Sequence, residues 1–530
     1  MARLLVVGLL LALLAPGLLP VGQAVAVPPP AAELGRLLPL AGNTFALATL
    51  AALIAVPAGA LAALALERSP VPGRQFLRAA VVVALVTPLP VWAVGWQAVL
   101  GGWLPSLSPP GEVAWRPWTT GLLPAAWMHG TAGLPWVVWI VSAALRTTDP
   151  GLEEDAALAG GPAAVWRRVL LPRALPAAAL AAGWVAIQAA GEIVVTDALQ
   201  VRTFAEEPYT RFVMGGDGLA AAVAVSVPPW LLTAAVGGLL LARGLRRFGH
   251  PPAEVVLRPS RSACGSPHAE REGHYLAAVG LWLGFLLTAG LPLLALALRC
   301  RPPSKLLDVL AADGPTLLVS LGAAGLAGLV AAGLAWPACV LARDSRWFAR
   351  LLFVACVLLA VAPGPVVGFG LKELIRHLLV AEEWLIGRPD FPPLASLLYD
   401  QPSPLPGAWA AAVRLFPVAV AILWPAVRAV PDGLLDAVAL DGTGRWRLVF
   451  APLTGPAFVR AGLAAAALAL GEVSAGKVVQ PPAAPAFVLR VFDQMHYGTD
   501  STVAALCLLQ IAAGAGIGLL LVRPTGKLPG

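Results

Sequence analysis

Two glutamates, Glu192 and Glu472, stand at the ends of apolar runs, and each directly follows a glycine. Each also lies 20 residues beyond a proline, and about 20 residues suffice to cross the hydrocarbon of a bilayer. Asp197 and Lys477 follow them closely. Because a carboxylate within a membrane is costly and usually faces a cavity or a partner, we expect these four residues to line a translocation pathway for a cation. The alternative is that the glutamates lie at the outer surface of the membrane and only cap or pair.

No pattern in the sequence predicts covalent chemistry, a cofactor or a defined metal site. Residues 471–477 (GEVSAGK) match the start of a phosphate-binding loop, but Val478 replaces the required Ser or Thr, and an apolar helix precedes the segment instead of a strand. The histidines and cysteines lack the spacing of metal ligands. For His496 and Tyr209 we expect loop contacts on the outer side. We therefore predict no catalytic residue and no cofactor, and the sequence leaves any metal ligand unknown.

The composition is that of a polytopic membrane protein. Of the 530 residues, 58% are hydrophobic and 12% are charged, against about 25% charged in soluble domains. Recurring apolar runs predict an all-α fold with about twelve transmembrane helices in a lipid bilayer. The net charge of +7 is expected in cytoplasmic loops and does not indicate a nucleic-acid partner. The expected spans are residues 4–22, 43–66, 77–100, 119–144, 174–199, 219–242, 275–298, 315–341, 347–371, 408–430, 456–479 and 501–522.

Two polar hairpins interrupt the apolar runs, at residues 151–176 and 432–456. The first begins with acids and ends with arginines, which favours helix starts and helix ends respectively. A Gly-Gly-Pro break at residues 160–162 divides it into two short helices. The second hairpin is a weaker copy. The residues on which this interpretation depends are Glu154, Asp155, Ala156, Gly160 and Arg167 in the first hairpin, and Asp436, Ala437, Gly442 and Arg447 in the second.

The hairpins belong to two copies of one longer sequence. Trp166 and Trp446 are separated by the same number of positions as Glu192 and Glu472. Upstream of the tryptophans the matching residues are slightly farther apart, and a turn can absorb the difference of two. The matched order predicts two parallel six-helix repeats around a central pathway.

A polar, basic segment at residues 243–274 separates the two sets of spans. We expect it to be a cytoplasmic linker between a first half, residues 1–242, and a second half, residues 275–530. The bias of Lys and Arg then places both termini and both hairpins in the cytoplasm. Residues 372–407 fall on the outer side and include an expected surface helix. Residues 4–22 also resemble a signal peptide, but the length of the run favours a retained helix.

At the hairpins the chain resembles the permease subunits of bacterial ATP-binding-cassette importers, whose cytoplasmic signature reads roughly E-A-A-x-x-x-G, a spacer, then L-P. The first hairpin has Glu154-Asp155-Ala156, Gly160 and Leu171-Pro172, and departs by one Asp. The second has Asp436-Ala437-Val438, Gly442 and Ala451-Pro452, with a shorter spacer and departures at three positions. A single chain with two fused halves is most similar to the ferric iron importers, with thiamine importers next. Residues 192–212 and 471–498 also resemble the iron branch.

The resemblance implies that each hairpin forms a short coupling helix in a groove of a cytoplasmic ATPase subunit. It implies two separate ATPase subunits, a periplasmic or lipid-anchored substrate-binding protein, and a location in the bacterial inner membrane. The shorter spacer predicts that the second hairpin docks differently or more weakly. Thiamine, a polyamine or an oxyanion are alternative cargoes. An ion-gradient-driven secondary transporter, with Glu192 and Glu472 as ion sites, is the alternative from another class.

Overall fold

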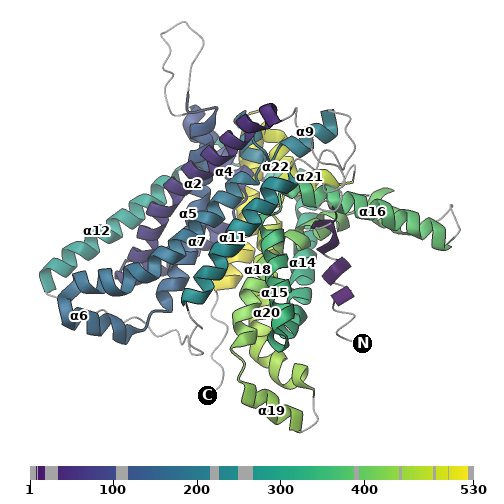
Figure 1. Ribbon diagram of the computed structural model, residues 1–530. Coiled ribbons are helices and arrows are strands. Elements are labelled where there is room, and N and C mark those ends of the chain that lie inside the picture. Colours follow the sequence, from purple (N-terminus) through teal and green to yellow (C-terminus); the bar gives the residue numbers. More distant parts are fainter. Residues whose placement is uncertain are drawn as a thin grey trace, which may run out of the picture.

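The chain forms a bundle of long apolar helices (Figure 1). Within the residues described below there is no strand. Eight helices are long and apolar enough to cross a membrane, and two further helix pairs pass the same criterion together but are sharply bent. The protein is therefore an all-helical, multi-pass membrane protein. The computed structural model describes parts of 7–19 and residues 34–102, 117–214, 226–248, 267–386, 393–400, 402–440, 444–481, 485–498 and 500–522.

Two groups of three helices form the centre of the bundle. In the first, α2 (Leu34–Arg68), α5 (Leu122–Arg146) and α7 (Leu171–Ala190) pack against one another. In the second, α14 (Ser304–Asp344), α18 (Leu405–Arg428) and α20 (Ala451–Ala469) do the same. Small residues permit close helix crossings in membranes. The closest is at Gly328 of α14, where a Cβ atom would lie 2.3 Å from the carbonyl oxygen of Gly462 on α20.

Each bent pair contains a proline at its break. The pair α3 (Arg74–Val86) and α4 (Leu89–Gly102) bends by 104° next to Pro88. The pair α15 (Arg346–Val361) and α16 (Gly364–Ile386) bends by 109° next to Pro363. Proline removes a backbone donor and disfavours helical geometry in the residue before it. Neither of the spans predicted at residues 77–100 and 347–371 is therefore one continuous helix, because each is broken near its middle.

The predicted spans 174–199 and 456–479 also end too late. Helix α7 stops at Ala190, and α20 stops at Ala469. Each is followed by a turn and then a short helix, α8 (Val194–Ala198) or α21 (Gly476–Val479). The two predicted glutamates thus lie in the turns, just beyond the long helices.

The remaining helices extend across the two groups. Helix α11 (Val227–Phe248) contacts α15, where the indole Nε1 of Trp230 donates to the carbonyl of Leu358 at 2.9 Å. Helix α12 (Pro267–Phe285) contacts α2, and α13 (Leu291–Arg299) and α23 (Ser501–Val522) both pack against α4. Helix α23 also contacts α14 and α20 of the second group. The segment predicted as a linker is helical at both ends, and residues 249–266 lie outside the described part.

Two hydrophobic cores result, and each draws on distant parts of the chain. The first core combines α2, α5 and α7 with α13, α22 (Phe487–Met495) and α23. The second core combines α14, α15 and α18 with α11 and with Leu10 and Leu14 near the N-terminus. The helices that begin and end each set of spans therefore lie largely on the core of the other set.

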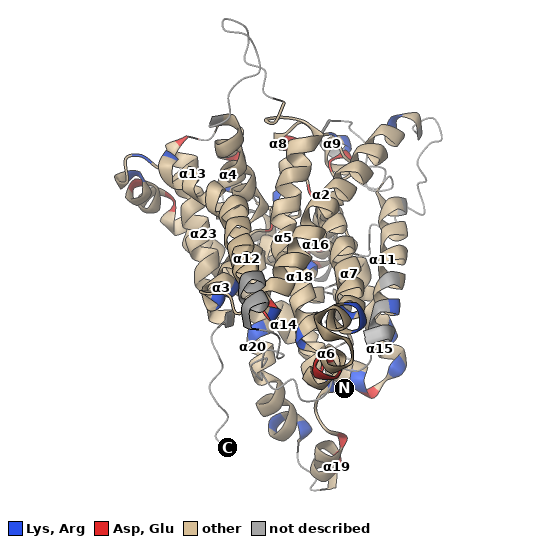
Figure 2. Ribbon diagram, turned by 90° about the vertical axis from the view of Figure 1, so that its left-hand side faces the viewer, with Lys and Arg blue, Asp and Glu red and all other residues tan. Residues whose placement is uncertain are grey.

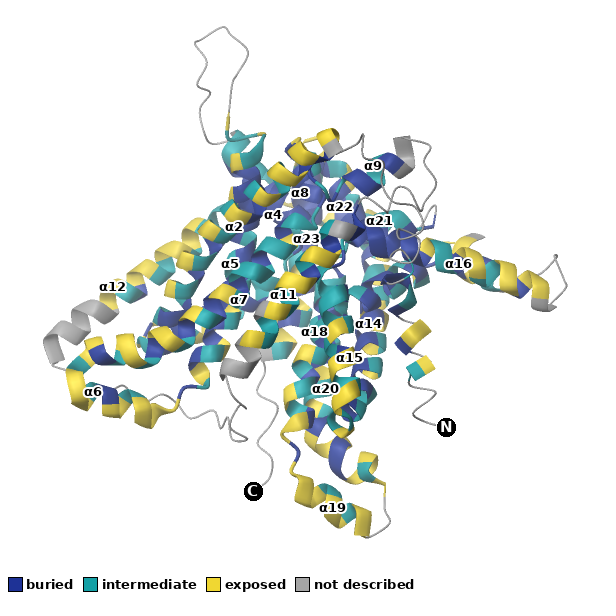
Figure 3. Ribbon diagram, viewed as in Figure 1, coloured by how far each residue is buried: buried dark blue, intermediate teal, exposed yellow. Residues whose placement is uncertain are grey.

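The two ends of the bundle differ. Helices α6 (Pro150–Val165) and α19 (Asp432–Leu440) protrude at one end, which we call the hairpin end, whereas α9 (Glu207–Met214) and α22 lie at the far end (Figure 1). Many Lys and Arg residues gather at the hairpin end (Figure 2). The outer part of α16, where a surface helix is predicted, extends sideways and is largely exposed (Figure 3).

Candidate functional site

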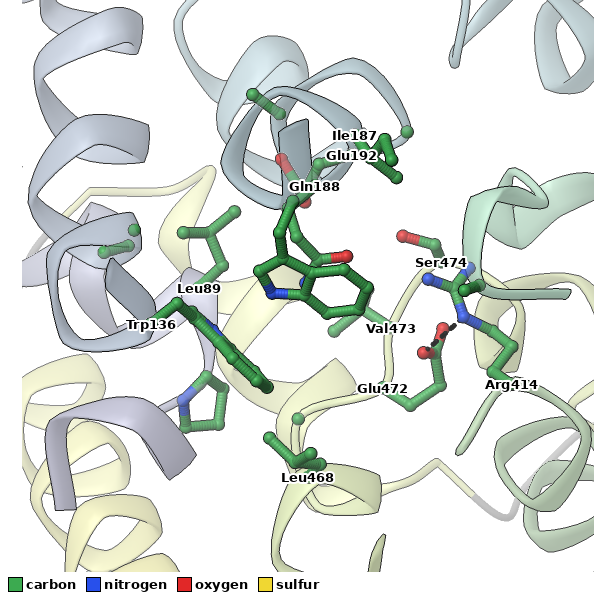
Figure 4. Close-up of a pocket in the computed structure, with 18 of the residues that line it drawn as sticks. Leu89, Trp136, Ile187, Gln188, Glu192, Arg414, Leu468, Glu472, Val473 and Ser474 are labelled. Carbon is green, nitrogen blue, oxygen red and sulfur yellow. Dashed lines mark ion pairs between the residues drawn. The ribbon is translucent and has the colours of Figure 1, made fainter. Parts of the chain in front are cut away.

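A central cavity of about 210 Å³ lies between the two groups of helices. Both proline breaks contribute to its wall, together with α5, α7, α18 and the turn after α20. Trp136 and Trp184, whose ring centroids are 5.2 Å apart, form an aromatic part of the lining. Glu192 and Glu472 both line this cavity (Figure 4). The structure therefore brings together the two carboxylates that the sequence analysis paired.

Glu192 caps the short helix that follows it. Its carboxylate accepts hydrogen bonds from the backbone N–H groups of Val194 at 2.5 Å and Val195 at 3.0 Å. Such bonds satisfy donors that a helix start leaves free, and they hold the carboxylate in one orientation. Glu192 therefore both lines the central cavity and caps a helix.

The other neighbour of Glu192 is an imidazole on α5. The His129 side chain is only 3% exposed, and its Nε2 lies 3.4 Å from Oε2 of Glu192. Its Nδ1 lies 2.9 Å from the carbonyl oxygen of Ala125, so Nδ1 carries a proton and donates it to that oxygen. The sequence analysis missed His129. The available signal was an isolated histidine within an apolar run.

Glu472 has a different partner. Its carboxylate accepts from the backbone N–H of Ala475 at 2.9 Å and from Nε of Arg414 at 2.9 Å (Figure 4). Arg414 lies on α18 and matches Ala132 of the first copy, so it stands one helical turn beyond the position that matches His129. Arginine keeps its charge at any physiological pH. Glu472 is thus neutralised by a permanent cation, whereas Glu192 faces an imidazole.

Asp197 and Lys477 lie elsewhere. Asp197 lines a second cavity of about 400 Å³ at the far end, where its Oδ2 lies 3.4 Å from Nε2 of His496. Lys477 places its ammonium group 4.8 Å from the ring centre of Tyr209 and 4.4 Å from that of Phe492, which are cation–π contacts. The two glutamates thus share the central cavity, whereas Asp197 lines the outer cavity and Lys477 packs against Tyr209 and Phe492. That all four residues line one translocation pathway stays a prediction.

Asp197 lies among charges of both signs, because Glu206 interacts with Asp197 and also with Arg202 and Lys477. Burial, together with the neighbouring Asp197 carboxylate, raises the pKa of Glu206 above its ordinary value. Among the described residues, no three or more His, Cys, Asp or Glu side chains converge into a ready metal centre. Either cavity can therefore offer a metal ion only a pair of such ligands from the described residues.

The first hairpin has the predicted break. Gly161 has φ 67°, a left-handed conformation that glycine tolerates best, and the π-helical turn Trp166–Leu170 follows. Glu154 and Asp155 are exposed, and neither caps the helix. That role belongs to Asp149, which accepts from the backbone N–H of Gly151 at 2.9 Å. Asp149 was missed, although Asp-Pro before a helix is a recognised start signal. Of the other predicted residues, Ala156 is buried, and Gly160 and Arg167 are exposed.

The second hairpin is built similarly. Helix α19 is followed by the π-helical turn Trp446–Phe450, and Asp436, Ala437 and Arg447 are exposed. Gly442 lies outside the described residues, so its predicted break is not described.

Arginines at the ends of the long helices anchor both hairpins. Arg68 of α2 donates to the carbonyl of Leu145 at 2.8 Å and to Glu153 at 2.7 Å. Arg343 of α14 donates to the carbonyls of Val427 and Val430 at 2.8 and 2.6 Å, and pairs with Asp432. Each arginine thus joins the end of α5 or α18 to the start of a hairpin.

Both hairpins present leucines to the surroundings. Leu158 and Leu440, which occupy matching positions in the two copies, are each 88% exposed. Leu152 and Leu434 also match each other and are about half exposed. The protruding hairpins are mostly exposed in Figure 3. Exposed apolar side chains that gather on one surface, and not single ones, mark contact sites for a protein or a membrane, and each hairpin presents two such leucines.

No family model, no curated protein and no solved structure matches the chain.

Proposed function

We propose that this protein is the transmembrane permease of an ATP-binding-cassette importer. The observation that carries the proposal is the pair of hairpins at one end of the bundle, each presenting a leucine that is 88% exposed. Each hairpin leads into a long helix, and the turn that follows this helix carries a glutamate of the same cavity. A protein that binds both hairpins could therefore act on both walls of the cavity through two rigid helices. This chain itself performs no covalent chemistry.

The proposal includes two parallel repeats of six spans each. The order of long helix, bent pair, long helix, hairpin and long helix occurs twice along the chain, with bends of 104° and 109°. The π-helical turns of the two hairpins begin at the matching tryptophans, Trp166 and Trp446. The proposal counts each bent pair as one span and adds the helical residues near 7–19, α11, the α12–α13 segment and α23, which would make twelve spans.

The partners follow from the two ends of the bundle. Two separate ATPase subunits would bind the hairpins, with Leu158 and Leu440 at the centres of the contacts. A periplasmic or lipid-anchored binding protein would deliver cargo at the far end. The Lys and Arg residues at the hairpin end support a cytoplasmic location for it, since cytoplasmic loops of membrane proteins carry an excess of these residues (Figure 2). The membrane would be the bacterial inner membrane, with both termini in the cytoplasm.

Ferric iron is the proposed cargo, because carboxylates line the central cavity. Among the described lining residues Arg414 is the one Lys or Arg, and it is paired with Glu472, which argues against an oxyanion. The Trp136–Trp184 wall is the observation that favours an organic cation, such as thiamine or a polyamine, as the alternative cargo. Uptake of radiolabelled Fe³⁺ and of radiolabelled thiamine by the same cells distinguishes these cargoes.

Co-purification tests the coupling. The tagged permease is isolated from its native membrane, and the ATPase bound to it is quantified. Burying one leucine contributes about 1.5–3 kcal/mol, so Leu158→Asp with Leu440→Asp should reduce ATPase binding more than tenfold. Tyr497→Asp is the matched control, because Tyr497 is also 88% exposed but follows α22 at the far end.

Two results would contradict the proposal. One is a wild-type permease that carries no ATPase; the other is a double leucine variant that binds the ATPase normally. The buried His129–Glu192 pair is the observation that favours the rival, a secondary transporter driven by an ion gradient. In that case uptake stops when the gradient is dissipated, even while ATP remains available.

A further inference from the structure

Two histidines face a carboxylate in the same way. In the central cavity Nε2 of His129 lies 3.4 Å from Oε2 of Glu192, and in the outer cavity Nε2 of His496 lies 3.4 Å from Oδ2 of Asp197. In both, Nδ1 lies close to the carbonyl oxygen four residues earlier, at 2.9 Å for His129 and at 2.8 Å for His496. The same local geometry therefore occurs once in each cavity.

The carbonyl bond fixes which ring nitrogen carries the proton. Because Nδ1 donates to a carbonyl, neutral imidazole presents the lone pair of Nε2 to the carboxylate, which also has only lone pairs to offer. The Nε2 of His129 is buried and makes no hydrogen bond with any described residue. A positive species between the two atoms resolves this conflict. It is either a proton, which gives an ion pair, or a metal cation.

The separation of 3.4 Å fits a metal cation. Imidazole nitrogens and carboxylate oxygens bind first-row metals such as zinc at about 2.1 Å, and two such ligands at a tetrahedral angle lie about 3.4 Å apart. The bond from Nδ1 to a carbonyl is also the usual support for a metal-binding histidine, since it fixes the tautomer and the ring orientation.

We propose that His496 with Asp197, and His129 with Glu192, form two successive binding sites for a transition-metal cation that passes through the protein. Imidazole and carboxylate together suit iron, zinc, manganese and similar ions. Each site supplies two protein ligands, and water in the cavities of about 400 and 210 Å³ completes the coordination. Two ligands are enough to hold an ion in transit and few enough to release it, which conduction through successive sites requires.

The two sites are neighbours along the chain. Asp197 is the fourth residue of α8, and Glu192 caps that helix. On α5, Met128 lines the outer cavity, and the adjacent His129 lines the central one. The two cavities thus share two walls, and the ion would move from one carboxylate to the other along α8. This order rests on the proposed function, in which cargo enters at the far end.

Glu192 and Asp197 face an imidazole and not a permanently charged side chain, which distinguishes them from Glu472. Glu472 is already paired with Arg414, and the ammonium group of Lys477 is held against Tyr209 and Phe492.

The chain also contains a matched control. His377 Nε2 lies 3.2 Å from Oε1 of Glu373, but that carboxylate already accepts two hydrogen bonds from Arg376, at 2.6 and 3.1 Å. A metal ion there would have to displace a guanidinium group. We therefore expect this exposed pair to bind no metal.

Cobalt binding tests the proposal. Full-length protein without a polyhistidine tag is purified in detergent at neutral pH, and bound Co²⁺ is measured by equilibrium dialysis and by its visible absorption. Wild type should bind two equivalents. His129→Gln and His496→Gln should each bind one, the double variant none, and His377→Gln two. Glu192→Gln should lose the same equivalent as His129→Gln, which gives a second measurement if one of these variants does not fold.

The proposal is overturned if wild type binds no Co²⁺ above the detergent blank, because the pairs are then held by protons. It is also overturned if the folded His129→Gln and Glu192→Gln variants still bind two equivalents. ATPase association is measured separately. If the protein binds Co²⁺ but no ATPase, the importer proposal is contradicted and the metal sites are supported. If it binds an ATPase but no Co²⁺, the importer proposal is supported and the metal sites are contradicted.

Discussion

The ion pair between Arg414 and Glu472 should stabilise the fold of the central cavity. The two side chains are 21% and 13% exposed, and Nε of Arg414 lies 2.9 Å from Oε2 of Glu472. Two unit charges about 4 Å apart attract by about 4 kcal/mol at an effective dielectric constant of 20. Removing one partner of a buried pair costs about 3–5 kcal/mol, because the other charge stays uncompensated. Partial exposure places the expected loss for Arg414→Met at the lower limit, about 3 kcal/mol.

A double-mutant cycle measures this interaction. The free energy of unfolding is determined by denaturant titration in micelles for wild type, Arg414→Met, Glu472→Gln and the double variant. The double variant leaves no unpaired charge, so it should be more stable than Arg414→Met alone, and the coupling energy should be about 2 kcal/mol. The control is the Arg490–Asp313 pair, in which Arg490 is 42% exposed and the closest N–O distance is 3.2 Å. Exposed pairs contribute about 0–1 kcal/mol, so Arg490→Met should have little effect.

The reasoning is refuted if the double variant is no more stable than Arg414→Met. In that case the two charges do not interact measurably, and the loss comes from the packing of the Arg414 stem. It is also refuted if Arg490→Met costs as much as Arg414→Met, because burial then does not decide the strength of the pair.

Two further predictions concern a helix crossing and an acidic residue. Gly328→Ala should cost about 1–3 kcal/mol, since its Cβ would lie 2.3 Å from the Gly462 carbonyl oxygen. Gly325→Ala, with nothing within 4 Å, should slightly stabilise α14; equal melting temperatures for the two variants would contradict this explanation. Burial raises the pKa of Glu206 above its ordinary value of 4.5. The ionised carboxylate therefore destabilises the folded protein at a pH above the raised pKa. This destabilisation disappears below pH 4.5, where Glu206 is protonated in both the folded and the unfolded protein. Glu206→Gln should raise the melting temperature at about pH 8 and leave it unchanged near pH 4, and a gain that does not depend on pH would rule out ionisation as the cause.

Hydropathy predicted most of the long helices but not the breaks. Helices such as α5 and α18 can be recognised as long apolar runs, because most of their side chains pack in the apolar cores or face lipid. Proline did not reveal the bends, since Pro57, Pro135 and Pro337 lie inside unbroken helices, whereas Pro88 and Pro363 lie at breaks. Neighbouring helices can satisfy the backbone groups that a proline leaves free. The outcome therefore depends on tertiary contacts that a local sequence does not contain.

The carboxylates of the cavity could be predicted, but their partners could not. Glu192 and Glu472 are conspicuous because charged residues are rare near apolar runs. His129 and Arg414 lie on separate helices, and a whole hairpin separates each of them from its partner in the sequence. No spacing rule joins residues so far apart. Asp197 was grouped with Glu192 because it is close in sequence, although the turn after α7 directs the two side chains into different cavities.

The exchange of helices between the two cores bears on how the chain is made. Ribosomes deliver membrane helices in order, yet the first core includes α22 and α23, which are synthesised last. Helix α3 packs against α23, so this part of the first core stays open until the final span has been inserted. Helices α3 and α4 must therefore stay in the bilayer without their contacts to α23 until that helix has been inserted. The second core contains no described residue beyond Val479, so it can be complete earlier, whereas a chain that stops before Ser501 lacks the α23 part of the first core.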